Sequence, residues 1–223
     1  MKGSVFISLV ALLALASSFA SAYDPSPLQD FCVGVNDTKL GVFVNGKFCK
    51  DPNLVVANDF FFHIMEGNTS NPLGSAVTRV SVNEFPGLNT LGISLERIDY
   101  APYGLDPPHI HPRATEVLTV LEGTLMAGFV ASDQNDNRFF TKVLNKGDVF
   151  IFPFAMVHFH LNIGHDNAVA LSSFSSQNPG ETTIANAVFG SKPLIPIDVL
   201  SKAFHVSKDL IAYLEKQQQY DNN

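Results

Sequence analysis

The chain has 223 residues, of which 46% are hydrophobic and 16% are charged, and its formal net charge is −7. This length is sufficient for one domain with a sizeable apolar core. An acidic chain without a cluster of basic residues is a poor match for nucleic acid, so the sequence argues against nucleic-acid binding.

The chain begins with a segment that is typical of a secretory signal peptide. Lys2 precedes an apolar run that ends in the small residues Ala20, Ser21 and Ala22. A charged start, an apolar middle and an A-x-A site predict residues 1–22 as a signal peptide that is cleaved after Ala22. The alternative, a transmembrane anchor, is disfavoured because the apolar run is short for a membrane span. We therefore expect a secreted protein with no membrane span after cleavage.

Residues 23–74 are predicted to form an irregular N-terminal arm, since residues 23–70 are rich in Asp, Asn, Pro and Gly. The arm holds the only two cysteines, Cys32 and Cys49. An even number of cysteines in a secreted chain suggests a disulfide, which would stabilise the fold by roughly 3 kcal/mol.

The same arm carries two acceptor patterns for N-glycosylation, which begin at Asn36 and Asn68. The pattern is short and often occurs by chance, but the secretory pathway is where such acceptors are modified. We therefore expect a glycoprotein with glycans at both positions.

From about Ser75 the pattern changes to short apolar runs separated by turn residues. Many short strands with turns at regular spacing are typical of a closed barrel or a jelly roll. The predicted strands are residues 76–82, 92–100, 116–122, 125–131, 138–144, 148–152, 157–163 and 168–175. Residues 102–108 are predicted to be a break between strands, because they are rich in Pro and Gly. Residues 75–176 are thus expected to form a single all-β domain.

The last part of the chain, residues 177–223, is predicted to be helical. The predicted helices are residues 182–189, 198–204 and 208–218. Ser207 is a suitable N-cap for the last of them, with Leu210 and Leu214 on one face. Because this helix has few apolar residues to bury in its own core, we expect it to pack on a neighbouring subunit and support oligomerisation.

A group of histidines and one glutamate predicts a metal site. His109 and His111 share strand parity, so their side chains point to one face, and Glu116 begins the next predicted strand. Imidazole nitrogen and carboxylate oxygen together suit a divalent transition metal. A third histidine is available in the strand that follows Pro153, where His158 and His160 share parity. Spacing alone does not decide which of these two is the ligand.

Two stretches resemble the cupin motifs of germins and germin-like proteins. The stretch GLDPPHIHPRATEVLTVLEG, residues 104–123, resembles the first motif. The stretch GDVFIFPFAMVHFHLN, residues 147–162, resembles the second. The likeness extends to PLQDFCV, GNTSNPLGSAVT, FPGLNTLGIS, SSFSSQNPG and FGSKPLIP, which together spread over almost the whole chain after the predicted signal.

The resemblance implies a cupin β-barrel, or jelly roll, with C-terminal helices. It also implies a Cys32–Cys49 bridge and a homo-hexamer built as a trimer of dimers, in which the terminal arm and the helices clasp neighbouring subunits. The metal ligands that it implies are His109, His111, Glu116 and His158. The implied metal is manganese, although the residues alone would hold iron, copper, nickel or zinc at least as tightly. Four protein ligands leave an octahedral ion two open positions.

This chain departs from the family pattern at three positions. Glycine usually stands where this chain has Ala155, and we expect a small local adjustment there. In germins that oxidise oxalate, two asparagines near the metal help to hold the substrate, and the matching positions here are Glu96 and Asp106. An ionised carboxylate only accepts hydrogen bonds and repels a dianion, so we expect weak or absent oxalate oxidase activity. The alternative is that both acids point to solvent or pair with Arg97 or Arg113.

The sequence therefore leaves several functions in competition, with no catalytic residue assigned beyond the metal centre. The first, which the resemblance to germin-like proteins implies, is a manganese-dependent oxidoreductase of the plant apoplast, a superoxide dismutase with a role in defence. The second is a non-enzymatic glycoprotein of the cell wall, acting in storage or as a receptor. Oxalate oxidation is the third.

Overall fold

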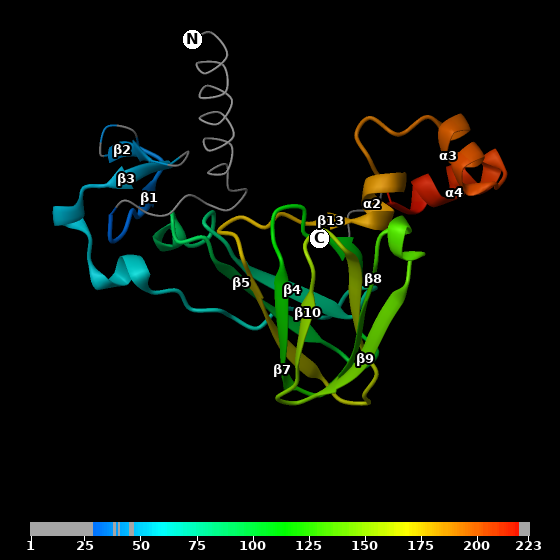
Figure 1. The fold of residues 1–223 in the computed structure, drawn as a ribbon, viewed down its shortest axis with the longest axis horizontal. Coiled ribbons are helices and arrows are strands. Elements are labelled where there is room, and N and C mark those ends of the chain that lie inside the picture. Colours follow the sequence, from blue (N-terminus) through cyan, green and yellow to red (C-terminus); the bar gives the residue numbers. More distant parts are fainter. Residues whose placement is uncertain (1–28, 38, 40, 45–46, 219–223) are drawn as a thin grey trace, which may run out of the picture.

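The computed structural model describes residues 29–37, 39, 41–44 and 47–218, and its central part is a β-barrel made from two five-stranded sheets (Figure 1). The predicted signal peptide lies outside the described residues. Within the described residues, no helix is long and apolar enough to cross a membrane.

Neighbouring strands in both sheets run antiparallel. The first sheet has the order β10-β7-β12-β5-β4, with bounds Val149–Phe152, Glu116–Glu122, Ala168–Phe174, Ser94–Tyr100 and Ser75–Val80. The second has the order β13-β6-β11-β8-β9, with bounds Thr182–Thr183, Leu105–Ile110, Val157–Asn162, Thr124–Val130 and Phe139–Asn145. Strands that are distant in sequence, such as β7 and β12, are neighbours in space, as in a jelly roll. The predicted all-β fold with C-terminal helices is confirmed.

The core lies between the sheets because alternate side chains of each strand point inward. In β7, Leu118 and Val120 are 0% and 1% exposed and belong to the apolar cluster of the core. β11 alternates in the same way, but its buried side chains are polar: His158, His160 and Asn162. Buried polar groups require partners, so this strand brings a polar site into the barrel.

β6 was predicted as a break and is a strand, so that prediction was wrong. Its residues Pro107 and Pro108 lack a backbone N–H, which normally excludes proline from the interior of a sheet. The pairing of β6 with β11 shifts register between His158 and His160, and the two prolines stand at this irregularity. A β-bulge interrupts the hydrogen-bonded ladder and so tolerates proline.

The N-terminal arm is more regular than the sequence predicted. It contains a three-stranded antiparallel sheet of order β1-β3-β2, with bounds Gly34–Val35, Lys47–Lys50 and Gly41–Val44. The Cys32–Cys49 disulfide is present, with a Cα–Cα distance of 5.0 Å. Asn36 and Asn68 are both exposed, and glycosylation there stays a prediction. Short 3-10 helices lie at Pro52–Leu54, Ala57–Phe60, Pro86–Leu88 and Asp133–Asn135.

The three predicted C-terminal helices are present, on the opposite side of the barrel from the arm (Figure 1). They are α2 (Ile184–Phe189), α3 (Ile197–Phe204) and α4 (Lys208–Gln218). The Ser207 hydroxyl accepts a hydrogen bond from the backbone N–H of Leu210 at 3.3 Å, as expected of an N-cap. Leu210 and Tyr213 remain 43% and 58% exposed, so α4 buries little of its apolar surface within its own chain.

Ala155 occupies the turn between β10 and β11 with a φ of +58°. This is the left-handed region, which costs an L-residue about 1–2 kcal/mol and costs glycine almost nothing. The expected local adjustment therefore does not move the residue out of the strained region.

Candidate metal centre

Four buried side chains converge inside the barrel at the end of β6. His109 lies on β6, His111 follows that strand, Glu116 is the first residue of β7, and His158 lies on β11. Their candidate ligand atoms all lie within 4.8 Å of one another. Each residue is at most 2% exposed. The register places His158 directly opposite His109, which is why residues far apart in sequence meet here.

Backbone carbonyls fix the orientation of the three imidazoles. Nδ1 of His109 lies 2.8 Å from the carbonyl oxygen of Pro107. Nδ1 of His111 lies 2.7 Å from the carbonyl oxygen of Gly180, and Nδ1 of His158 lies 2.8 Å from that of Met156. Because a carbonyl oxygen only accepts, each Nδ1 carries the proton and each Nε2 presents its lone pair to the centre. Metal-ligating histidines are usually held in this way.

The same geometry tests whether a cation fits. Oε2 of Glu116 lies 2.9 Å from Nε2 of His158 and 3.1 Å from Nε2 of His111. Lone pairs held this close repel one another unless a cation or a proton lies between them. Among the described residues, Nε2 of His111 is buried with no hydrogen-bond partner. The donor set therefore fits a divalent transition metal.

The protonation states of the cluster are partly set by burial. Burial opposes ionisation of Glu116, yet the adjacent imidazoles of His111 and His158 hold the pKa of its carboxyl well below the ordinary value. Burial lowers the pKa of His109. Burial also disfavours the charged form of His111, but the carboxylate of Glu116 beside it raises its pKa. Metal binding at such a centre would release any proton held between His111 and Glu116.

Ser172 on β12 supports Glu116 and was not identified from the sequence. Its hydroxyl donates to Oε1 of Glu116 at 2.5 Å, which leaves Oε2 directed at the histidines. The available signal was strand parity, since Ser172 faces the interior with Ala170 and Phe174. Parity alone does not distinguish a serine that supports a ligand from an ordinary buried serine.

His160 lies outside this group of four. It is fully buried, and its Nδ1 lies 3.2 Å from the Tyr100 hydroxyl and 3.4 Å from Oδ2 of Asp106. Its Nε2 is 3.7 Å from Oε1 of Glu116. The structure thus groups His158, and not His160, with His109 and His111.

Asp106 faces the interior and does not point to solvent. It lies on β6, is 6% exposed, and its Oδ1 is 3.7 Å from Nδ1 of His109. Burial opposes its ionisation, but His109 and His160 lower the pKa of its carboxyl. An ionised carboxylate therefore lies beside the histidines.

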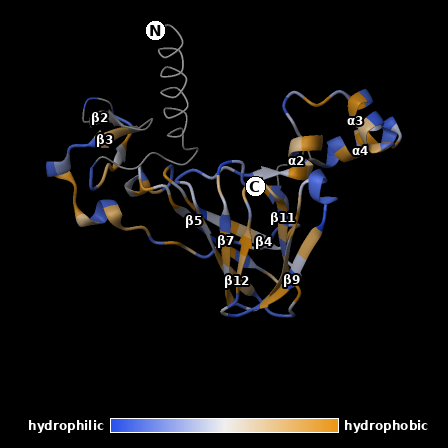
Figure 2. Ribbon diagram, in the orientation of Figure 1, coloured by the Kyte–Doolittle hydropathy of each residue, from blue (hydrophilic) through white to orange (hydrophobic). Residues whose placement is uncertain are grey.

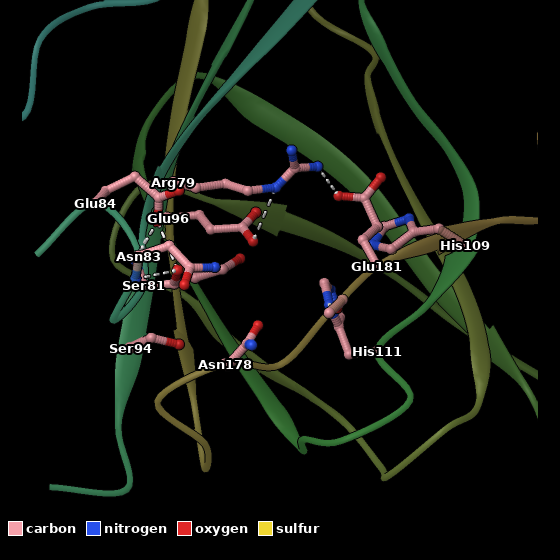
Figure 3. A network of polar contacts seen from close by, with 12 residues as sticks. Arg79, Ser81, Asn83, Glu84, Ser94, Glu96, His109, His111, Asn178 and Glu181 are labelled. Atoms are coloured by element: carbon pink, nitrogen blue, oxygen red, sulfur yellow. Dashed lines mark hydrogen bonds and ion pairs between the residues drawn. The ribbon is translucent and has the colours of Figure 1, made fainter. Parts of the chain in front are cut away.

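Glu96 on β5 is also 6% exposed. It does not pair with Arg97 or Arg113, the partners considered above, because Arg97 binds Asp99 and Arg113 binds the Asn178 carbonyl. Glu96 lies near Arg79, whose Nε is 3.9 Å from Oε1 of Glu96 (Figure 3). Burial raises the pKa of Glu96 to about 8.

Comparisons with known proteins agree with this geometry. The family model described as Cupin matches residues 64–211. Germin-like protein subfamily 1 member 7 of Arabidopsis thaliana is 61% identical over 211 residues, covering 94% of this chain and 92% of that protein. Germin-like protein subfamily 1 member 13 of the same plant is 58% identical over 217 residues, covering 96% of this chain and 98% of that protein. Recombinant oxalate oxidase in complex with glycolate superposes with a TM-score of 0.83 at 44% identity, covering 87% of this chain and 98% of that one.

Proposed function

The chain belongs to the germin-like proteins of the cupin family, and from this premise we propose that it is a secreted manganese protein with superoxide dismutase activity and little oxalate oxidase activity. We further propose that it acts in the plant apoplast or cell wall, in defence, as a glycosylated hexamer. The observation that carries the metal assignment is the buried group of three imidazoles and one carboxylate. Manganese itself is proposed from the family and not from the donor set.

The chain's own residues would prepare the site for a metal. His109, His111 and His158 would hold it through Nε2, and Glu116 would hold it through the oxygen that Ser172 leaves free. Manganese bound there would supply one-electron chemistry between its +2 and +3 states. The surrounding barrel excludes bulk water from the ligand shell, because each of these residues is almost fully buried.

Charge beside the site favours superoxide over oxalate. Asp106 is ionised and buried near His109, so it opposes a dianion about twice as strongly as a monoanion. Asp106 and Glu96 also lack the amide N–H groups that an asparagine offers to an anionic substrate. These two substitutions support low oxalate turnover.

Oxalate oxidation is retained as the second candidate, because the 44% identical structure is an oxalate oxidase. The test is to assay dismutase and oxalate oxidase activities on one manganese-loaded preparation. We expect dismutase activity that depends on the metal, survives heating and is lost in His111→Ala. His165→Ala, which changes an exposed histidine, is the matched control and should retain full activity.

Three outcomes separate the candidates. Robust oxalate turnover would overturn the proposed selectivity. Bound metal with neither activity would favour a non-enzymatic wall glycoprotein, in which the metal stabilises the barrel. Dismutase activity that persists in His111→Ala would place the chemistry elsewhere.

A further inference from the structure

An exposed tyrosine and an exposed histidine form a pair away from the candidate metal centre. Tyr103 lies in the turn between β5 and β6, and His165 lies in the turn between β11 and β12. The Tyr103 hydroxyl is 2.6 Å from Nδ1 of His165. β6 begins just after Tyr103 and ends beside the metal ligands, so the pair and the metal centre lie at opposite ends of this strand.

The buried side chain of Asn162 holds the two turns together. Asn162 is 0% exposed, and its Nδ2 donates to the carbonyl oxygens of Ala101 at 2.9 Å and Asp166 at 2.8 Å. Ala101 lies two residues before Tyr103, and Asp166 directly follows His165. One amide group therefore connects the turns that carry the pair, and the contact between the two side chains rests on a fixed backbone.

The backbone of Tyr103 is strained. Its φ is +62°, in the left-handed region that is unfavourable for a residue with a Cβ atom. Strained residues persist only where the surrounding structure holds them, and they cluster at functional sites. The strain therefore favours a role for the phenol of Tyr103.

The three tyrosines that the structure describes differ in exposure and in polar partners. Tyr100 is 1% exposed, so its ring does not meet molecules in solvent. Tyr103 and Tyr213 are 60% and 58% exposed. Among the described residues, Tyr213 has no polar partner, whereas Tyr103 contacts His165. Within this part of the chain, Tyr103 alone combines an accessible ring with an adjacent base.

An adjacent base makes a phenol easier to oxidise. Loss of an electron alone would leave a phenol radical cation, which is a very strong acid, so oxidation is easier when the proton leaves at the same time. In the tautomer with its proton on Nε2, Nδ1 of His165 accepts the phenol proton. The two rings are nearly perpendicular, with centroids 5.7 Å apart, so His165 is not stacked on the Tyr103 ring.

We propose that Tyr103 is a site of oxidative coupling to a second phenol, with His165 as the acceptor of its proton. The oxidant is hydrogen peroxide acting through a haem peroxidase. Each phenol loses one electron and one proton, and the two radicals join through a carbon–carbon bond between the ring positions beside their oxygens. Peroxide takes up the two electrons and two protons and becomes two water molecules. The inference rests on the proposed function only for the natural source of peroxide.

The test treats the purified protein with a haem peroxidase, hydrogen peroxide and a biotin-linked phenol. Mass spectrometry of peptides measures the initial rate of labelling at each tyrosine. We expect label at Tyr103 in the wild type and none at that position in Tyr103→Phe. In His165→Ala the rate at Tyr103 should fall about a hundredfold, the lower end of what a positioned base contributes to proton transfer.

Two further measurements separate a base from a residue that only positions the ring. Added imidazole should restore part of the rate at Tyr103 in His165→Ala, because it supplies the missing proton acceptor. Labelling of the wild type should be slower in deuterated water, because a proton moves with the electron. His205→Ala, which changes another exposed histidine, is the matched control and should behave as wild type.

An unchanged rate at Tyr103 in His165→Ala would overturn the inference, as would wild-type label confined to other tyrosines or the absence of rescue by imidazole. Without the probe, peptides joined through two Tyr103 rings would identify a second copy of the chain as the partner phenol. Coupling to the probe alone would identify a free phenol, and either result supports the proposal. Because peroxide is added, the outcome is independent of dismutase activity.

Discussion

Three backbone carbonyls and one side chain outside the ligand set hold the candidate metal centre in its geometry. Backbone carbonyls at Pro107, Met156 and Gly180 orient the histidines, and Ser172 orients Glu116. These contacts determine which atoms face the centre, so removing one should weaken metal binding without removing a ligand.

Ser172→Ala should lower metal affinity by about 10–100-fold, the usual effect of deleting a group that orients a ligand. The affinity is measured by competition with a chelator. Ser173→Ala, which changes the exposed neighbour on the same strand, is the control and should leave the affinity unchanged. Equal affinities in both variants would show that Glu116 keeps its position without Ser172.

Glu96 should make the metal-free protein less stable as the pH rises. Burial raises the pKa of Glu96 from 4.5 to about 8, opposed mainly by His111 and Arg79. Between these two pKa values, Glu96 binds more protons in the folded state than in the unfolded state. The contribution of Glu96 to the free energy of unfolding is therefore fully present below its pKa in the unfolded state and is lost as the pH rises through its pKa in the folded state.

From about pH 5 to pH 8, the free energy of unfolding of the wild type should fall by about 3 kcal/mol relative to that of Glu96→Gln. Urea unfolding of both metal-free proteins at each pH measures the difference. Parallel pH profiles would mean that Glu96 titrates near its ordinary pKa in the folded protein.

Strands and turns show where prediction from the sequence succeeds and where it stops. The alternation of apolar residues identified β7, β8 and β11 closely, since a half-buried strand has period two. β6 was missed because Pro107 and Pro108 indicate a break, and only the register of the partner strand reveals the bulge that accommodates them.

Strand parity and family resemblance predicted the residues of the candidate site, but parity alone did not predict all of them. Parity placed His109 and His111 on one face, but it left His158 and His160 equivalent. What separates them is three-dimensional: Tyr100 and Asp106 engage Nδ1 of His160, whereas the Met156 carbonyl orients His158 toward Glu116. Arg79 and Glu181 were not identified, because their pairing joins positions far apart in the sequence.

The turn between β10 and β11 stores strain at Ala155. Ala155→Gly should raise the free energy of unfolding by about 1 kcal/mol, because glycine adopts a φ of +58° without a Cβ clash. Chemical denaturation measures the change. Ala131→Gly, at an ordinary backbone conformation, should instead destabilise the protein. Destabilisation by both substitutions would indicate that Ala155 is not strained.

The whole molecule presents apolar surface that a monomer would leave in water. Figure 2 shows hydrophobic residues along β9, and a groove of about 610 Å³ lies between β9 and β10. Phe139, Val149 and Ile151 line it and are 48%, 56% and 57% exposed. Exposed apolar patches of this kind are typical of subunit interfaces, which supports the proposed oligomer.

Ile151→Asp should lower the mass of the assembly in solution, because a charge in this groove would be buried unpaired in an interface. Multi-angle light scattering measures the mass, and circular dichroism checks that the barrel is intact. Lys146→Asp, in the exposed turn before β10, is the control and should assemble as wild type. A monomeric wild-type protein would end the oligomer proposal.

The most direct test of the metal centre is the metal content of the purified protein after removal of loosely bound ions. We predict stoichiometric manganese in the wild type and in His165→Ala, and its loss in His111→Ala with the barrel still folded. A wild-type protein that holds no more manganese than His111→Ala would contradict the account.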